Sequence, residues 1–359
     1  MTHASEPHHA SPGDMRRERL ETLLDRFVGL KILVVGDLML DEYIWGHAGR
    51  VSPEAPVLVV EVRNTTYSLG GAANVANYAR HLGAAVSVAG VVGSDSSGVT
   101  LREKLRAGGC DTQGVLTEAG RPTTLKTRIV AQNQQVVRVD RETREEVPRE
   151  TVDRLLGVIE SEMPTADAII LSDYAKGVLS DRLIAAVIRS ARDRRKPVTA
   201  NLKPPRVEPF HGATLVTLNL QELERAEHET IAGEAALIRC GSRLRERLDC
   251  GGLLVTRGGD GLVLFMPEAG PVRIPARRVE VFDVVGAGDA VITAAVLSLA
   301  AGADCAEAAA LGNVAGNIKV TKAGTAAVEL DEIRRFLDAN LAEVRSHADP
   351  TGVSRRAAA

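Results

Sequence analysis

Short apolar runs rich in β-branched residues recur along this chain, and amphipathic helical patterns separate them. This alternation constrains the fold most, because neighbouring parallel strands need a long crossover between them, usually a helix. The sequence therefore predicts an α/β fold whose mostly parallel sheet is covered by helices on both faces. The expected strands are 32–35, 86–92, 168–171, 197–200, 215–218 and 253–256, and the expected helices are 71–82, 98–107, 151–162, 181–193 and 234–248, with two more beginning near 286 and 306.

Two stretches, 43–62 and 123–140, break this alternation because polar and apolar residues interleave and no crossover helix accompanies them. They are expected to pair into a small antiparallel sheet beside the main domain. Since they lie far apart in the sequence, this sheet would be an inserted lid of the kind that excludes water from a transfer reaction. The expected organisation is a mobile tail over 1–29, one domain over 30–343 and a second mobile tail over 344–359.

Composition removes several classes of function. The chain of 359 residues has 44 basic and 47 acidic side chains, and only 3% of its residues are aromatic, so it lacks the basic footprint and stacking residues of a nucleic-acid binder. Its four cysteines form no CxxC pair, which favours reduced thiols and a cytoplasmic protein. The N-terminus has no apolar segment of a signal peptide, and the most apolar run, 290–303, is shorter than the roughly 20 residues that cross a membrane.

The sequence Asp-Val-Val-Gly-Ala-Gly-Asp at 283–289 leads directly into that apolar run, which is compatible with a helix. Glycines at the start of a helix leave backbone amides exposed at the positive end of its dipole, so Gly286, Ala287 and Gly288 are expected to form an anion hole. Such donors stabilise the charge that grows on a transferring phosphoryl group. Asp289 is the candidate base for the proton of an attacking hydroxyl. Taken alone, these residues also fit a glycine turn followed by an acidic first helical turn.

Two further segments follow expected strands, at the edge where open α/β sheets bind ligands. The glycine-rich segment 256–261 suits the close approach of a nucleotide, although hairpin turns have a similar pattern. Its candidate nucleotide-binding residues are Thr256, Arg257, Gly258 and Gly261. Asn219 begins a helix, and Glu222 is placed to hold a water molecule bound to Mg²⁺. The alternative for this pair is a helix cap with glutamate at the third position.

The first expected strand leads into Gly-Asp-Leu-Met-Leu-Asp at 36–41, which places Asp41 on a strand exit. A carboxylate there can accept hydrogen bonds from two neighbouring sugar hydroxyls. Gly70 and Gly71 open the next expected helix and allow a substrate to approach the backbone closely. Asn74 could direct its amide at a hydroxyl. The plainer alternatives are a turn aspartate and an asparagine that caps its own helix.

In this order, over roughly residues 30–343, the motifs resemble those of the ribokinase-like (PfkB) carbohydrate kinases. Three further segments narrow the resemblance to the kinases of D-glycero-β-D-manno-heptose 7-phosphate in the ADP-heptose pathway of lipopolysaccharide core synthesis; they are RVSPEAPV at 50–57, NQQVVRVD at 133–140 and LSDYAKG at 171–177. The resemblance implies a three-layer α/β/α fold with a lid. It also implies transfer of the γ-phosphoryl group of ATP to the C1 hydroxyl, which gives the 1,7-bisphosphate.

The same resemblance assigns roles to individual residues. It makes Asp289 the catalytic base and 286–288 the anion hole, and it places Mg-ATP near Asn219 and Glu222. The other implied assignments are phosphate and ribose contacts at 256–261, adenine contacts at Asn313 and Asn317, a monovalent-cation region at Asp283 and Gly324, and sugar contacts at Asp41, Gly70, Gly71 and Asn74. The implied cofactors are therefore ATP and Mg²⁺, with K⁺ as the candidate monovalent ion.

A 7-phosphate requires cationic ligands, because Arg binds phosphate bidentately and Lys acts as a point charge. The candidates are Lys126, Arg128 and Arg138 in the expected lid, and Lys176 and Lys203 at strand exits. Lys176 and Arg128 are the favoured pair. For each of the five, the alternative is a surface cation or an internal ion pair.

The chain departs from the general family pattern beside the anion hole. Val285 stands where the family usually has threonine, and Ala290 stands where threonine commonly follows the catalytic aspartate. A hydroxyl contact to a cation or a phosphate is therefore missing at both positions. These departures bear on cation dependence more than on the type of reaction.

Other functions remain in competition at this point. A kinase of another sugar or sugar phosphate and a catalytically silent sugar-phosphate sensor share the same fold, whereas a dinucleotide-dependent oxidoreductase is disfavoured because no GxGxxG follows the first strand. The exposed edges of the lid predict a homodimer through the lid. No His-x-Gly-His motif of an adenylyltransferase follows the kinase motifs, so a kinase-only protein is expected, with adenylyl transfer performed by a separate enzyme.

Overall fold

The computed structural model describes residues 17–132, 134–324 and 326–346. The strands of its larger sheet are β1 (Lys31–Gly36), β4 (Ala85–Gly93), β5 (Asp111–Glu118), β8 (Ala168–Ser172), β9 (Val198–Asn201), β10 (Leu215–Asn219), β11 (Gly252–Thr256), β12 (Leu262–Phe265) and β13 (Val272–Ile274). Their order is β13-β12-β11-β10-β9-β8-β1-β4-β5. The strands from β11 to β5 are parallel, and β12 and β13 are antiparallel additions at one edge. The expected parallel sheet is therefore present.

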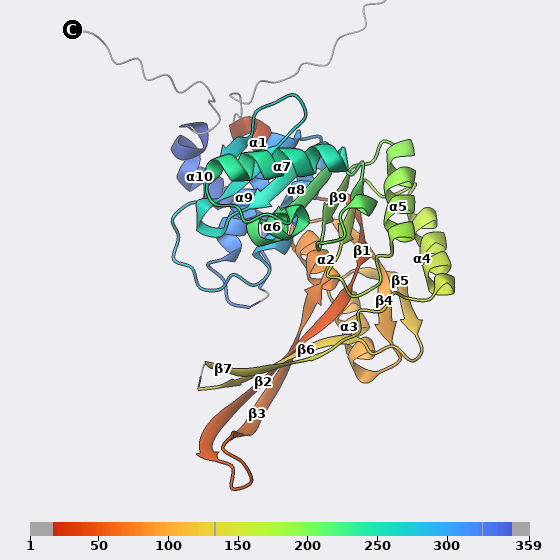
Figure 1. Cartoon of the computed structure of the whole chain (residues 1–359), viewed down its shortest axis with the longest axis vertical. Coiled ribbons are helices and arrows are strands. Elements are labelled where there is room, and N and C mark those ends of the chain that lie inside the picture. The colour runs from red at the N-terminus through yellow and green to blue at the C-terminus, as the bar shows by residue number, and fades with distance from the viewer. Residues whose placement is uncertain (1–16, 133, 325, 347–359) are drawn as a thin grey trace, which may run out of the picture.

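Helices cover both faces of this sheet because successive side chains of its buried strands point to opposite sides. In β1, Ile32 and Val34 join one apolar cluster, and Leu33 and Val35 join the other. The first cluster takes in α1 (Arg17–Asp25), α2 (Ala72–His81), α3 (Ser96–Ala107), α8 (Ala287–Ala300), α9 (Cys305–Lys319) and α10 (Leu330–Ser346). The second takes in α4 (Arg149–Glu162), α5 (Asp181–Asp193), α6 (Leu220–Glu227) and α7 (Glu234–Leu248). The result is a three-layer α/β/α arrangement (Figure 1).

Helix α8 explains how the carboxyl end of the sheet acquires a buried polar site. Its residues from Asp289 to Ser298 are all buried, because α2, α9 and the sheet surround it. A helix that is apolar on every side is stable only inside a protein. Asp289, in the first turn of α8, is therefore buried next to the loop that follows β8, whereas Gly288 in the same turn stays exposed.

A second sheet of four strands lies beside the main body. It contains β2 (Leu38–Val51), β3 (Leu58–Gly71), β6 (Thr124–Ala131) and β7 (Gln134–Arg141), in the order β3-β2-β6-β7. Figure 1 shows β2 and β3 extending well away from the helical layers. The expectation of an antiparallel sheet is wrong for its central pair, because β2 and β6 are parallel. Both strands begin near the carboxyl edge of the main sheet, after β1 and β5, and run outward from it.

The structure differs from the expected tails at both ends. Arg17–Asp25 form α1, whose Leu20, Leu23 and Leu24 are buried in the core, since leucines at helical spacing make this segment amphipathic. At the other end α10 continues to Ser346. The rest of the expected tails, 1–16 and 347–359, lies outside the described residues. Within the described part of the chain, the structure contains no helix with the length and apolarity that crossing a membrane requires.

Candidate active site

Asp289 lies at the centre of a polar cluster formed by three separate segments. It is in the first turn of α8, and its two carboxylate oxygens accept hydrogen bonds from different side chains. The amide of Asn74, in α2, donates to Oδ2 at 2.7 Å, and the hydroxyl of Tyr174, after β8, donates to Oδ1. Asn74 does not cap its own helix, because Gly71 occupies the N-cap position of α2. The structure thus brings Asn74 and Asp289 together, as a shared site requires.

The environment of Asp289 suits a general base. Burial raises the pKa of its carboxyl, and the hydrogen bonds from Tyr174 and Asn74 lower that pKa in part. A carboxylate whose pKa is raised accepts a proton more readily than an unperturbed one. The carboxylate is therefore positioned by two donors and made more basic by its surroundings.

The glycines before Asp289 have different structural roles. Gly286 has a φ of 77°, and a Cβ at this position would lie 2.6 Å from the hydroxyl oxygen of Tyr78. A Cβ on Gly288 would meet nothing within 4 Å. Among the described residues, the amides of Gly288 and Asp289 donate to no backbone carbonyl. The amide of Ala287, one of the three expected donors, instead donates to the Val284 carbonyl at 3.2 Å, so the open amides of this turn are those of Gly288 and Asp289.

Sequence reasoning did not assign two residues of this site, Tyr174 in the loop after β8 and Asp37 after β1. Asp37 accepts hydrogen bonds from the backbone amides of Tyr174, Lys176 and Val178, at 2.8, 3.0 and 3.1 Å. Burial and the nearby charge of Asp173 raise the pKa of Asp37 to about 6, and the three amides oppose this shift. Asp37 therefore positions the loop that brings Tyr174 to Asp289. Asp37 lies in segment 36–41 and Tyr174 in segment 171–177, and the resemblance of these two segments to the family was the signal that could have identified both residues.

Replacing Tyr174 by phenylalanine is expected to shift the acidic limb of the pH profile of kcat/KM to higher pH. Burial and the charge of Asp289 raise the pKa of the Tyr174 hydroxyl well above its ordinary value, so the hydroxyl remains a donor. Its loss removes an interaction that favours the ionised carboxylate, so the pKa of Asp289 rises. The shift should be about one pH unit, since a hydrogen bond to a charged group contributes roughly 1.5–3 kcal/mol.

A matched control for this profile is Tyr67→Phe, because Tyr67 lies on β3 near Glu42. Its acidic limb should coincide with that of the wild-type protein. A Tyr174→Phe profile that also coincides with the wild type would show that the hydroxyl does not tune Asp289.

On the nucleotide side, Asn219 and Glu222 form a capping box at the start of α6. The backbone amide of each residue donates to the side chain of the other, at 2.8 and 2.9 Å, so the helix cap that the sequence offered as the alternative is present. Glu222 is also buried and pairs with Lys203, whose ammonium lies 5.5 Å from the centre of the Tyr174 ring. The cap and a role near Mg-ATP are compatible, because the cap holds the carboxylate at the strand edge.

The site fits a magnesium ion that arrives with a nucleotide. The described residues contain no group of three or more His, Cys, Asp or Glu side chains that could hold a metal by themselves. Mg²⁺ commonly binds through one or two carboxylates together with substrate phosphates and water. Glu222 is the candidate carboxylate, as the sequence predicts.

The remaining candidate nucleotide contacts fall into two groups. Thr256 ends β11, and the segment 257–261 forms the turn between β11 and β12, with Arg257 paired to Glu234 and Asp260. A Cβ on Gly261 would lie 2.2 Å from the carbonyl oxygen of Ile274, so this glycine is required by packing. On α9, Asn313 donates to the Pro275 carbonyl, and Asn317 accepts from the amide of Arg277 and donates to the Asn313 carbonyl. These asparagines therefore hold the segment after β13.

Asp41 lies within β2, not on a loop as the sequence suggests, and pairs with Arg128 at 2.5 Å. The Arg128 guanidinium also lies 5.3 Å from the ring centre of Tyr43. A Cβ on Gly70 would lie 2.5 Å from the Asp41 carboxylate, so this glycine leaves space for it. Burial is the main cause of the raised pKa of Asp289, and the negative charge of Asp41 adds to it. The two carboxylates therefore lie in one region.

All five candidate phosphate-binding cations form ion pairs in the structure. The ammonium groups of Lys126 and Lys176 both pair with the carboxylate of Glu142, at 3.2 and 2.8 Å. These two ion pairs join the small sheet to the loop after β8. The other pairs are Lys126 and Arg138 with Asp140, Arg128 with Asp41, and Lys203 with Glu222. Glu142, which the sequence reasoning did not single out, is therefore the acceptor around which two of these cations gather.

The region expected to hold a monovalent cation is closely organised. The carboxylate of Asp283 accepts hydrogen bonds from the amides of Val285 and Gly324, each at 2.9 Å. These bonds connect the loop before the anion hole to the turn after α9. Both oxygens of Asp283 therefore already have backbone partners.

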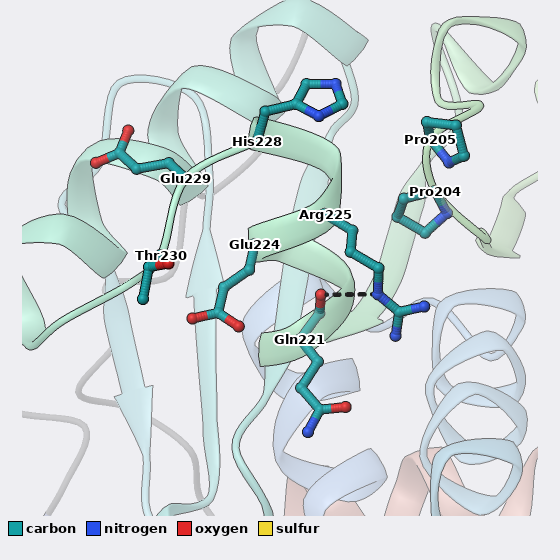
Figure 2. A pocket seen from close by; sticks show the side chains of 8 residues that line it. All are labelled: Pro204, Pro205, Gln221, Glu224, Arg225, His228, Glu229 and Thr230. Carbon is teal, nitrogen blue, oxygen red and sulfur yellow. Dashed lines mark hydrogen bonds between the residues drawn. The ribbon is translucent and has the colours of Figure 1, made fainter.

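A separate surface pocket of about 690 Å³ lies against the outer side of α6. Figure 2 shows its lining side chains, with Arg225 bonded to the Gln221 carbonyl and the pair Pro204 and Pro205 on the opposite wall. None of the candidate site residues lines it. The reactive cluster around Asp289 is therefore distinct from this pocket.

Comparison with known proteins identifies the family of the chain. Residues 30–332 match the pfkB family carbohydrate kinases. The chain is 44% identical over 311 residues to Bifunctional protein HldE of Desulfatibacillum aliphaticivorans, covering 87% of this chain and 64% of that protein. It is also 44% identical over 319 residues to Bifunctional protein HldE of Geobacter metallireducens, covering 89% and 65%. The chain thus spans slightly less than two thirds of the length of these relatives.

Solved structures share the fold at low sequence identity. A ribokinase of Arabidopsis thaliana complexed with ribose and ATP superposes with a TM-score of 0.67 at 18% identity, covering 86% of this chain and 99% of that chain. Phosphofructokinase-2 from Escherichia coli in complex with potassium gives a TM-score of 0.70 at 17% identity, covering 87% and 99%. The ribokinase-like fold expected from the sequence is confirmed. With the family match extending over the strands, the glycine motif and Asp289, the chain belongs to the pfkB family of carbohydrate kinases.

Proposed function

We propose that this protein transfers the γ-phosphoryl group of ATP to the C1 hydroxyl of D-glycero-β-D-manno-heptose 7-phosphate, giving the 1,7-bisphosphate for ADP-heptose and lipopolysaccharide core synthesis. The observation that carries the proposal is the buried carboxylate of Asp289, which Asn74 and Tyr174 position at the open amides of α8. The three sequence segments at 50–57, 133–140 and 171–177, together with the identity to the HldE proteins, support the choice of sugar.

The geometry supports a simple division of labour. Asp289 accepts the proton of the C1 hydroxyl while that oxygen forms a bond to the γ-phosphorus and the bond to the leaving ADP breaks. The amides at the start of α8 stabilise the negative charge that develops on the transferring group. Mg²⁺, when bound with ATP near Glu222, would neutralise phosphate charge. Asp41, Gly70, Gly71 and Asn74 are the proposed sugar contacts.

ATP consumption with the heptose 7-phosphate, measured beside fructose 6-phosphate, fructose 1-phosphate and ribose, tests this proposal. Phosphorus NMR of the product identifies the position that receives the phosphate. Selective conversion of the heptose to a 1,7-bisphosphate is expected. Preferred turnover of another sugar would replace the proposed substrate, and ATP binding without turnover of any sugar would favour a silent sensor.

Lys176→Ala and Arg128→Ala should each raise the KM for the sugar phosphate by about 10- to 100-fold, because each removes charge-assisted hydrogen bonds to the 7-phosphate. Both side chains lie on the lid side of the site, paired with Glu142 and Asp41, and phosphate would compete with these carboxylates. The KM for ATP should stay unchanged. Initial rates with each substrate varied in turn give both constants.

Lys203→Ala is the matched comparison for these variants, since Lys203 pairs with Glu222 on the nucleotide side. It should raise the KM for ATP more than that for the sugar. An unaltered sugar KM in Lys176→Ala or in Arg128→Ala would remove that residue from the phosphate site.

The small sheet also supports a homodimer. Its outer strands, β3 and β7, have free edges in the described structure, and it exposes apolar side chains that include Val62, Val137 and Val139. Exposed edges and apolar patches favour association with a second copy.

Val139→Lys on β7 should therefore shift the mass measured by sedimentation from dimer to monomer. Val28→Lys, at an exposed valine outside the lid, should stay dimeric; an unchanged Val139→Lys dimer would place the interface elsewhere.

The proposed location is the cytoplasm, where ATP is available and thiols stay reduced. All four cysteines of the chain are free thiols in the structure. Burial raises the pKa of Cys110 and Cys305 to about 11 and that of Cys250 to about 12, which keeps these thiols protonated and unreactive.

A further inference from the structure

Lys319, the last residue of α9, has a side chain that is fully buried, with 0% exposure. Lysine is almost never fully buried unless its charge is compensated. An ammonium group has three donors, and in the described part of the chain Nζ makes one hydrogen bond, 3.4 Å long, to the carbonyl oxygen of Lys322. Its burial therefore requires negative charge nearby.

The surroundings of Lys319 supply such charge from two sources. The carboxyl end of α9 carries the negative end of the helix dipole, which favours a cation. Burial lowers the pKa of the Lys319 ammonium, and the negative charges of Asp283 and Asp289 oppose this effect. The group thus lies within the electrostatic reach of both the candidate base and the carboxylate that organises the loop before the anion hole.

Backbone hydrogen bonds connect the residue that follows Lys319 to that loop. The carbonyl oxygen of the next residue, Val320, accepts from the amides of Phe282 and Asp283 at 2.7 and 3.1 Å. The Asp283 carboxylate in turn accepts from Val285 and Gly324, so the turn after Lys319 and the segment leading to Gly286 form one unit. A change in charge at Lys319 would therefore alter the position of the anion hole.

The donor set of this region fits an internal ammonium better than a metal cation. Both oxygens of Asp283 already accept backbone amides. K⁺ is bound by several oxygen ligands that replace its water, and Val285 and Ala290 have no side-chain oxygen to offer, so a K⁺ site here would depend on backbone carbonyls and the remaining lone pairs of Asp283. Lys319 already places one positive charge at the turn after α9, where Nζ bonds to the Lys322 carbonyl, without an added ion.

We propose that the ammonium of Lys319 is the built-in monovalent cation of this site, a positioning residue that binds the turn after α9 and so holds the 282–288 loop in the shape of the anion hole. Phosphoryl transfer would then require no added K⁺. This inference rests on the proposed kinase function, but it concerns the site of charge in this chain and holds for any sugar that the enzyme accepts.

The first experiment measures turnover of the wild-type protein, Lys319→Ala and Lys319→Met in KCl, NH₄Cl, NaCl and choline chloride at equal ionic strength. Wild-type turnover should be the same in all four salts. Both variants should lose about 10- to 100-fold in choline chloride, as expected for a residue that orients a site through others. KCl and NH₄Cl should restore the turnover of Lys319→Ala, because the smaller side chain leaves space for an ion. They should not restore the turnover of Lys319→Met, whose side chain keeps the bulk of lysine without its charge.

Lys322→Ala is the matched control, because its ammonium bonds to the Ala327 carbonyl and to Glu332. Its turnover should show no response to K⁺. Activation of the wild-type protein by K⁺, or wild-type turnover of Lys319→Met in choline chloride, would overturn the proposal.

Thermal unfolding without sugar separates this proposal from that of the substrate. KCl should raise the Tm of Lys319→Ala and leave that of the wild-type protein and of Lys319→Met unchanged, relative to choline chloride. This readout remains valid if the heptose is not the substrate. Equal Tm responses of the wild-type protein and Lys319→Ala would contradict a built-in cation even if the heptose is phosphorylated.

Discussion

Replacing Asp289 by asparagine is expected to lower turnover by about 10²- to 10⁴-fold, the usual contribution of a general base. The amide retains the size of the carboxylate and can still contact Asn74 and Tyr174, but it cannot accept the proton of the attacking hydroxyl. The free energy of unfolding should not fall greatly, because the substitution removes a buried charge whose pKa burial raises.

Steady-state kinetics together with calorimetric ATP binding checks this expectation. ATP affinity should remain within a few-fold of the wild-type value, since the amides of α8 are unchanged. The matched comparison is Asp193→Asn, at the last residue of α5, where the aspartate is exposed and turnover should be retained. Near wild-type turnover of Asp289→Asn would show that another group takes the proton.

The second large effect is expected from alanine at the two glycines of the anion hole. Gly286→Ala should destabilise the fold by about 1–3 kcal/mol, because φ at this position is 77° and the new methyl group would lie 2.6 Å from the Tyr78 hydroxyl. It should also lower turnover by about 10²- to 10³-fold through displacement of the amide donors. Gly288→Ala should unfold like the wild-type protein, because its methyl group meets no protein atom within 4 Å.

The comparison of these two variants separates folding from catalysis. Gly288→Ala should still lose turnover, since its methyl group occupies space at this turn that the protein leaves open for phosphate oxygens. Denaturant unfolding and steady-state rates measure the two quantities independently. If Gly288→Ala keeps full activity, phosphate does not approach this turn, and the anion hole must lie elsewhere.

Much of the fold follows from local sequence pattern. The helices at 181–193 and 234–248 have the limits that the sequence predicts, because their apolar residues recur at helical spacing and Ser180 caps the first of them. The parallel sheet follows from the same alternation. The small sheet was less predictable, since an alternating pattern identifies a strand but does not determine the direction of its neighbour, and β2 and β6 proved to be parallel.

By itself the sequence determined six of the nine strands described for the main sheet, most of the helices, and the glycine turn and acidic first turn of α8, because these depend on residues close together in the chain; β5, β12 and β13 were not predicted. Only the tertiary structure decided which side chains meet. Tyr174 reaches Asp289 across 115 positions and Asn74 reaches it across 215, and neither contact leaves a periodic pattern in the sequence. The same holds for Lys126 and Lys176 at Glu142 and for the buried ammonium of Lys319, since burial and charge compensation arise only when distant segments pack together.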